Sequence, residues 1–210
     1  MEYTAEQVWG LAVRADVINS GYVKESVWGQ SDSGESRVVK EANKILVKQW
    51  LRDNVQPTAD EVAQGQEVRR YFNTFTLKAL MGKINDFERQ ALRIAQMDLF
   101  TGRNLLEFAI VSCLPETARR DQSRTELNRE IYGSEQLQGE VGDTVVGDIT
   151  VIASRYSKEY NKFKIQARMG DSFVDFWYKE AAVGELRVKG KIKQHRGNKT
   201  TQLNHVKRVS

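Results

Sequence analysis

The hydrophobic period of the chain changes near Gly133, and this change constrains the fold more than any other feature. Before it, apolar residues recur at helical spacing, as Val8, Leu11 and Ala15 do. After it, polar and apolar residues alternate. A helical period buries one side of a helix, whereas a period of two buries one face of a strand. The sequence therefore predicts an α+β protein, with a helical domain over residues 1–138 and a β domain over residues 139–210.

The alternating stretches of the β domain are short and are separated by turn residues. They cover residues 146–151, 162–168, 172–177, 186–194 and 200–209. Five strands within about seventy residues match the size of an OB-type barrel, a partly open Greek-key barrel that commonly binds oligonucleotides on its strand 2–3 face and loops. An SH3-like barrel has similar strands and is the alternative fold.

Capping boxes indicate where helices of the N-terminal domain begin. Thr4 precedes Gln7, and Thr58 precedes Glu61, each at the spacing of a capping box. The apolar pattern predicts a polar loop over residues 30–36, followed by a helix that includes Val38 and Trp50 and is stopped by Asp53 and Asn54. A long helix is expected from Thr58 to Gly82, and shorter helices over residues 86–97, 102–114 and 116–132.

The net charge of +4 is unevenly distributed. Residues 139–210 carry 14 Lys and Arg and eight Asp and Glu, a net charge of +6, whereas residues 1–138 have a net charge of −2. From residue 186 to the end, eight residues are basic and none is acidic. Such a segment creates a positive field that suits phosphate groups.

One predicted strand carries four cations on a single face. Alternation sends Leu186, Val188, Gly190 and Ile192 to one side and Arg187, Lys189, Lys191 and Lys193 to the other. The hairpin tip that follows is also basic and polar, with His195, Arg196, Asn198 and Lys199. An ordinary solvated strand face is the alternative interpretation.

Proteins that bind single strands combine such a basic surface with aromatic side chains on which bases stack. Tyr156, Tyr160 and Trp177 are the candidates for stacking. If Val174 and Phe176 point inward, Trp177 points outward; the sequence leaves both directions open. The candidate nucleic-acid-binding residues are Tyr156, Tyr160, Lys162, Lys164, Trp177, Arg187, Lys189, Lys191, Lys193, His195, Arg196, Asn198 and Lys199.

The end of the chain resembles a known family. The run from Val183 to His195, followed by Thr200 to Lys207, is similar to OB-fold segments of tailed-bacteriophage proteins, in which the last strand reads TQLNRVK. Residues 71–88 and 175–180 also resemble uncharacterised phage proteins of this organisation. The resemblance covers residues 66–210 and implies an OB fold and a role with single-stranded DNA in phage replication or recombination. His205 departs from the Arg of the family pattern.

Enzyme signals are weak. The segment from Gly197 to Thr200 lacks the glycine spacing and the helix of a phosphate loop. His195 and His205 are too few to form a metal site, and Asp121, Glu126 and Glu130 lie in a highly charged helix. We therefore expect no catalytic residues, no metal and no cofactor. The lone Cys113 is expected to fill the core.

These features favour a non-catalytic, largely sequence-nonspecific single-stranded-DNA-binding protein. One alternative is a protein-interaction module that docks onto a replication or transcription protein of the phage or host, and another is an RNA-binding accessory factor. The chain has no apolar run of membrane-spanning length and no signal peptide, so we expect a cytoplasmic protein with no membrane partner, in the host cell if it is viral.

Overall fold

The computed structural model describes residues 1–30 and 34–209. Contacts divide the chain into two compact units, Met1–Ser123 and Arg124–Ser210. The division falls within helix α7 (Leu114–Gly133), whereas the sequence pattern suggests a boundary after residue 138. Each unit has its own hydrophobic core, and the chain has the predicted α+β architecture.

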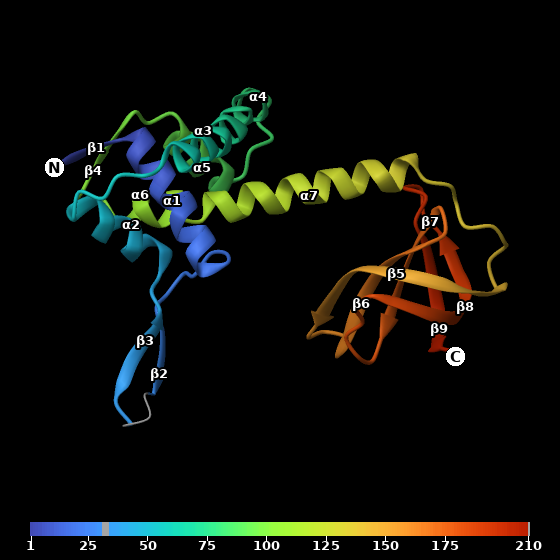
Figure 1. Ribbon diagram of the computed structural model, residues 1–210. Helices are drawn as coiled ribbons and strands as arrows, with labels where there is room; N and C mark the ends of the chain where they lie inside the picture. Colours follow the sequence, from blue (N-terminus) through green and yellow to red (C-terminus); the bar gives the residue numbers. More distant parts are fainter. Residues whose placement is uncertain (31–33, 210) are drawn as a thin grey trace. The chain divides into compact units, whose positions relative to one another are not determined.

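Helices form most of the first unit (Figure 1). Helix α1 (Ala5–Asn19) packs against its neighbours through Val8, Trp9 and Leu11, all of which are almost completely buried. The predicted capping boxes at Thr4 and Thr58 are both formed. The remaining helices wholly within this unit are α2 (Asn43–Arg52), α3 (Ala59–Asn73), α4 (Phe75–Leu80), α5 (Asp86–Ala95) and α6 (Leu105–Val111).

Two expectations for the helical domain are wrong. A hairpin of strands β2 (Val27–Gln30) and β3 (Ser36–Lys40) replaces the expected helical start at Val38, and it projects from the helices of its unit in Figure 1. Part of the expected polar loop, residues 31–33, lies outside the described residues. The expected helix over residues 58–82 is divided into α3 and α4 at Thr74, whose hydroxyl donates to the Tyr71 carbonyl at 2.6 Å.

Strands β1 (Glu2–Thr4) and β4 (Leu99–Thr101) form a second small sheet.

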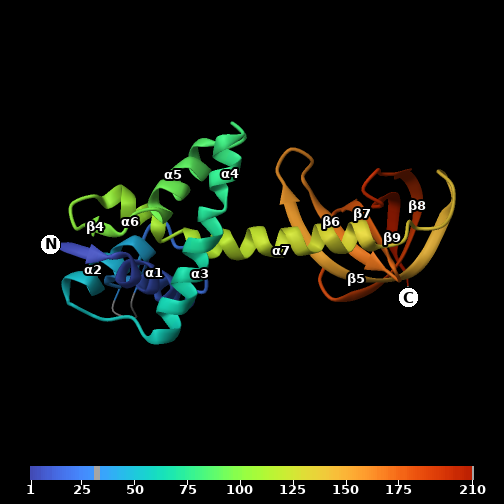
Figure 2. The same ribbon diagram turned by 90° about the horizontal axis from the view of Figure 1, so that it is seen from above.

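The second unit contains a closed barrel of five strands. These are β5 (Thr144–Ser157), β6 (Lys162–Met169), β7 (Ser172–Tyr178), β8 (Glu185–His195) and β9 (Thr201–Arg208). Their order is β5-β6-β7-β9-β8, and the only parallel pair among these strands is β7 with β9. This arrangement is that of an OB-type barrel. Figure 2 shows the strands curving around one another.

The directions of the β7 side chains follow from the core. Val174 and Phe176 belong to the barrel core, together with Ile165 of β6. Because side chains alternate along a strand, Asp175 and Trp177 face outward. This outward surface of β6 and β7 is the strand 2–3 face on which OB-type barrels commonly bind oligonucleotides.

Candidate nucleic-acid interface

The alternation expected in β8 is confirmed. Val188, Gly190 and Ile192 are buried, and the intervening cationic side chains are exposed. Arg187 lies 3.4 Å from the Asp148 carboxylate, but both side chains are largely exposed. Within the described part of the chain, no ion pair involves Lys189, Lys191 or Lys193. These three lysines therefore keep their charge available to an external anion.

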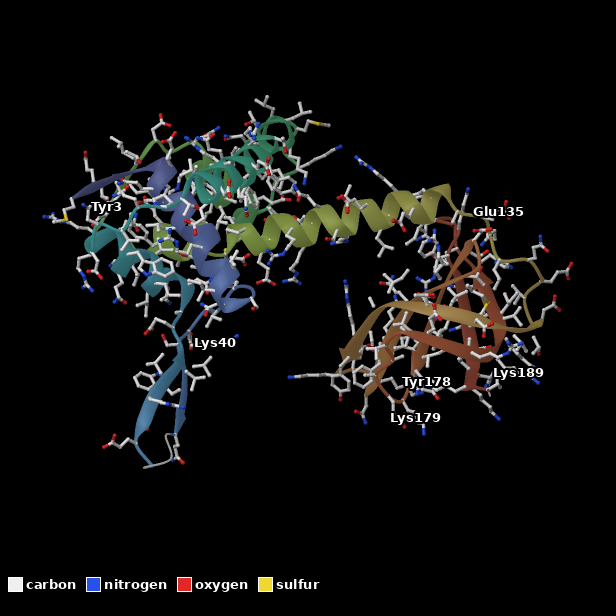
Figure 3. The ribbon with its side chains drawn as sticks, in the orientation of Figure 1. Tyr3, Lys40, Glu135, Tyr178, Lys179 and Lys189 are labelled. Atoms are coloured by element: carbon white, nitrogen blue, oxygen red, sulfur yellow. The ribbon has the colours of Figure 1, made fainter. Side chains whose placement is uncertain are left out.

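Strand β9 adds a further cation to this surface. Lys207 lies directly opposite Lys189, and Asn204 lies opposite Lys191. Directly opposed like charges destabilise a sheet. The β8–β9 surface thus concentrates positive charge at a cost in stability, and Figure 3 shows Lys189 on the barrel.

A groove lies between the end of β7 and strand β9. The two strands are paired only at Val174 with Thr201 and Asp175 with Gln202, and beyond these pairs the groove occupies the space between them. Its volume is about 620 Å³. We call it the β7–β9 groove. It is lined by Lys162, Trp177, Tyr178, Lys179, Lys193, Gln202, Leu203, Asn204, His205, Val206, Lys207 and Arg208.

The lining of the β7–β9 groove is cationic and aromatic and includes no carboxylate. Lys193 and Lys207 connect it to the lysines of β8. The buried Oδ1 of Asn204 has no hydrogen-bond partner within the described residues. Buried polar atoms are normally paired, so this acceptor is available to a donor that enters the groove.

A β-bulge shapes one wall of the groove. Lys189 and Lys191 are opposite Lys207 and Asn204, so two residues of β9, His205 and Val206, oppose the single Gly190. His205 has a left-handed backbone with φ of 49° and an exposed side chain. Such backbone conformations are uncommon outside glycine and cluster at functional sites.

Two aromatic side chains lie together beside the groove. The ring centroids of Tyr160 and Trp177 are 4.8 Å apart with an interplanar angle of 41°. Tyr160 is 54% exposed, and a hydrogen bond to Glu159 raises the pKa of its phenol. Because Trp177 lines the groove, this pair offers apolar ring surface next to the cations.

Tyr156 lies elsewhere. It is paired with Phe163, which packs against the barrel core, and the two rings are 5.3 Å apart. Its hydroxyl donates to Oδ1 of Asn161 at 2.7 Å. Strand alternation therefore places Tyr156 on the opposite side of the sheet from Trp177.

Asp175 forms ion pairs with two of the candidate phosphate-binding cations. Its carboxylate is 3.0 Å from the Arg196 guanidinium and 3.4 Å from the Lys164 ammonium, and its side chain is only 3% exposed. The Asp175 carboxylate thus partly neutralises the charges of Arg196 and Lys164.

Internal hydrogen bonds also hold the rest of the hairpin tip. His195 donates from Nε2 to the Gly139 carbonyl at 2.9 Å, and its Nδ1 lies 2.9 Å from the Thr201 hydroxyl. Asn198 accepts from the Thr200 amide, and Lys199 donates to the Ser134 carbonyl at 2.9 Å. These contacts fix the turn and connect it to the segment before the barrel.

Several groove residues were absent from the candidates drawn from the sequence. They are Tyr178, Lys179, Gln202, Leu203, Asn204, His205, Val206, Lys207 and Arg208. The basic stretch after residue 186 already indicated Lys207 and Arg208. Two cations among these nine residues already interact with other side chains. Lys179 is 3.1 Å from the Glu180 carboxylate, and the Arg208 guanidinium lies 5.4 Å from the centre of the Tyr178 ring.

Comparison with protein-family models, curated proteins and solved structures finds no match for this chain. The class is therefore defined by the fold alone: a helical unit followed by an OB-type barrel. Across residues 1–30 and 34–209, no helix has the length and apolarity needed to cross a membrane, and no cluster of three or more His, Cys, Asp or Glu side chains could hold a metal ion.

Proposed function

We propose that the barrel binds single-stranded DNA, largely without regard to sequence, in the β7–β9 groove. The observation that carries this proposal is the lining of the groove, in which lysines and Trp177 occur without any carboxylate. Bases stack on Trp177 and Tyr160, and the phosphates contact Lys162, Lys193 and Lys207. Lys189 and Lys191 extend the phosphate path along β8.

The chemistry of the groove favours a single strand over a duplex. Aromatic rings can stack only on bases that are not already stacked within a helix, whereas every base of a single strand presents a ring face. The cations contribute affinity through release of counterions from the phosphates, which is independent of sequence. Stacking and counterion release together give tight binding with little base preference.

The resemblance of residues 66–210 to tailed-phage proteins adds a biological setting to this proposal. A sequence-nonspecific binder of this kind supports phage DNA replication or recombination. RNA presents the same phosphates and ring faces, so RNA binding is the competing function within the same groove.

Fluorescence anisotropy of the full chain with labelled oligonucleotides tests the proposal. We expect single-stranded DNA to bind more tightly than duplex DNA of equal length, and competition by unlabelled single-stranded RNA measures how far the groove prefers DNA. If about four phosphates are neutralised, log K should fall against log salt with a slope of about −3. Equal affinity for the duplex would contradict the proposed groove.

A combined variant, Lys189→Glu, Lys191→Glu and Lys193→Glu, tests the phosphate path. We expect its affinity for single-stranded DNA to fall by about a hundredfold or more, because three attractive contacts become repulsive. Lys24→Glu, Lys83→Glu and Arg89→Glu together provide the matched control, since these exposed residues of the helical unit change the net charge equally. If both variants lose the same affinity, only net charge matters and the path along β8 is wrong.

A further inference from the structure

A second hollow lies entirely within the unit Met1–Ser123, with a volume of about 600 Å³. One wall is the solvent-facing side of α2, where Ile45, Lys48, Gln49 and Arg52 recur at helical spacing. The loop from Gly102 to Leu105 and the N-terminal strand complete it. We call it the α2 pocket, and Figure 3 labels Tyr3, one of its lining residues.

The floor and edge of the α2 pocket are apolar. Phe108 is fully buried beneath it, while Ile45 and Leu105 are 41% and 49% exposed at its edge. A side chain at Gly102 would place its Cβ 3.3 Å from the Tyr3 ring, so glycine lets this loop lie close to the ring. The Gly102 amide also donates to the Met1 carbonyl at 3.1 Å, which fixes the loop against the N-terminal strand.

Three cations surround this apolar floor, and the lining contains no carboxylate. Within the described residues, Lys48 and Arg103 form no ion pair, and Arg52 has only an exposed neighbour, Asp53, at 3.8 Å. Other arginines of the same unit are paired closely: Arg14 with Glu61 at 2.6 Å, Arg69 with Asp98 at 2.7 Å and Arg119 with Asp16 at 2.6 Å. The pocket therefore gathers cations that the unit leaves uncompensated.

We infer that the α2 pocket docks a short acidic peptide segment of a partner protein, anchored by one bulky apolar side chain. The anchor enters over Phe108 between Ile45 and Leu105, and the carboxylates meet Lys48, Arg52 and Arg103. Charge complementarity selects an acidic partner, and the apolar floor distinguishes this ligand from a free anion. The phosphate of a nucleotide would meet the same cations, so a nucleotide is the competing ligand that the test must exclude.

The test uses the full chain and a fluorescein-labelled octapeptide of Asp and Glu with one central Phe, measured by anisotropy. We expect saturable binding that weakens about tenfold or more when the Phe is replaced by Ser, and equally when the acids are replaced by their amides. No binding of the Phe peptide, or full displacement by adenosine monophosphate, would overturn the inference.

Two variants locate the binding. We expect Lys48→Glu combined with Arg103→Glu to abolish binding of the acidic peptide, and Leu105→Ser to weaken it about tenfold. Lys24→Glu combined with Arg89→Glu is the charge-matched control and should bind as the original chain does. Unfolding curves of every variant establish that the helical unit remains folded. Unchanged affinity in a folded Lys48 and Arg103 variant would contradict the assignment to this pocket.

Discussion

The carboxylate of Asp175, in the middle of β7, holds the guanidinium of Arg196 at 3.0 Å and so ties the hairpin tip to the outer face of the barrel. Lys164 shares the same carboxylate. We expect Asp175→Asn to lower the free energy of unfolding by about 1–3 kcal/mol, because two cations lose a charged acceptor. Urea unfolding measures this change.

The same substitution should also affect binding. Without Asp175, Lys164 and Arg196 become available to phosphates, so we expect tighter binding of single-stranded DNA and a steeper dependence on salt. Asp148→Asn is the matched control, since its ion pair with Arg187 is largely exposed and contributes little to stability. A weaker affinity in folded Asp175→Asn would indicate that the carboxylate positions Arg196 for the ligand.

Lys189 and Lys207 provide a second prediction, in which stability and binding change in opposite directions. Lys207→Glu replaces a repulsive cross-strand pair with an attractive one, so the free energy of unfolding should rise by about 0.2–1 kcal/mol. Affinity for single-stranded DNA should fall. Thermal unfolding and anisotropy on the same samples test both effects, and a less stable variant would argue against direct repulsion between these lysines.

Trp177→Ala tests stacking in the β7–β9 groove. Loss of one stacking platform should weaken binding of single-stranded DNA by about 1–3 kcal/mol, and Trp177→Phe should restore part of that loss. Tyr156→Ala removes an aromatic ring from the other side of the sheet, so we expect it to reduce stability more than binding. Equal losses of affinity in the Trp177 and Tyr156 alanine variants would mean that the ligand does not follow the groove.

The ion pair of Glu61 with Arg14 predicts a pH dependence of stability in the helical unit. The hydrogen bond from Arg14 lowers the pKa of Glu61 in the folded chain. The stabilisation that this ion pair gives the folded chain is therefore complete above the pKa of Glu61 in the unfolded chain, about 4.3. It is lost as the pH falls through the lower pKa of Glu61 in the folded chain. Glu61→Gln should be less stable than the original chain at neutral pH, and the difference should shrink under acid. A constant difference across this range, measured by urea unfolding, would exclude the linkage.

Cys113 should be slow to react. Burial raises the pKa of its thiol to about 11, and its Sγ lies 3.0 Å from the Ile110 carbonyl. Since the thiolate is the reactive form, alkylation by iodoacetamide near neutral pH should be much slower than for free cysteine. The rate should rise when urea unfolds the chain. Rapid alkylation without urea would show that the thiol is accessible in the folded state.

The sequence predicts the barrel better than the helical unit because period-two alternation carries a direct signal of one buried face. In β8 this signal correctly assigns each side chain from Leu186 to Ile192 to its face. The hairpin β2–β3 gives no such signal, since every described residue of β3 is exposed. Its Val38 therefore fitted the helical period of the residues that follow it equally well.

Interactions between distant strands limited the prediction of the candidate site. The local sequence does not indicate that Asp175 forms an ion pair with Arg196. Strand β8 lies between them along the chain, and only the folded barrel brings the two residues together. For the same reason, the basic stretch indicates Lys207 and Arg208 as cations but not their place in the groove, which depends on β7 and β9 being neighbours. The place of His205 in the groove depends on the same pairing.

The short parallel pairing that closes the barrel has a mechanical consequence. Only two residues of each strand pair at this seam, whereas the neighbouring antiparallel ladders are much longer. Parallel pairing is also slightly less stable per residue. Local separation of β7 from β9 thus requires fewer hydrogen bonds to break than opening at any other edge of the barrel. The amides of this seam should exchange with solvent before those of the rest, and the β7–β9 groove can widen there with little loss of the other strand pairings.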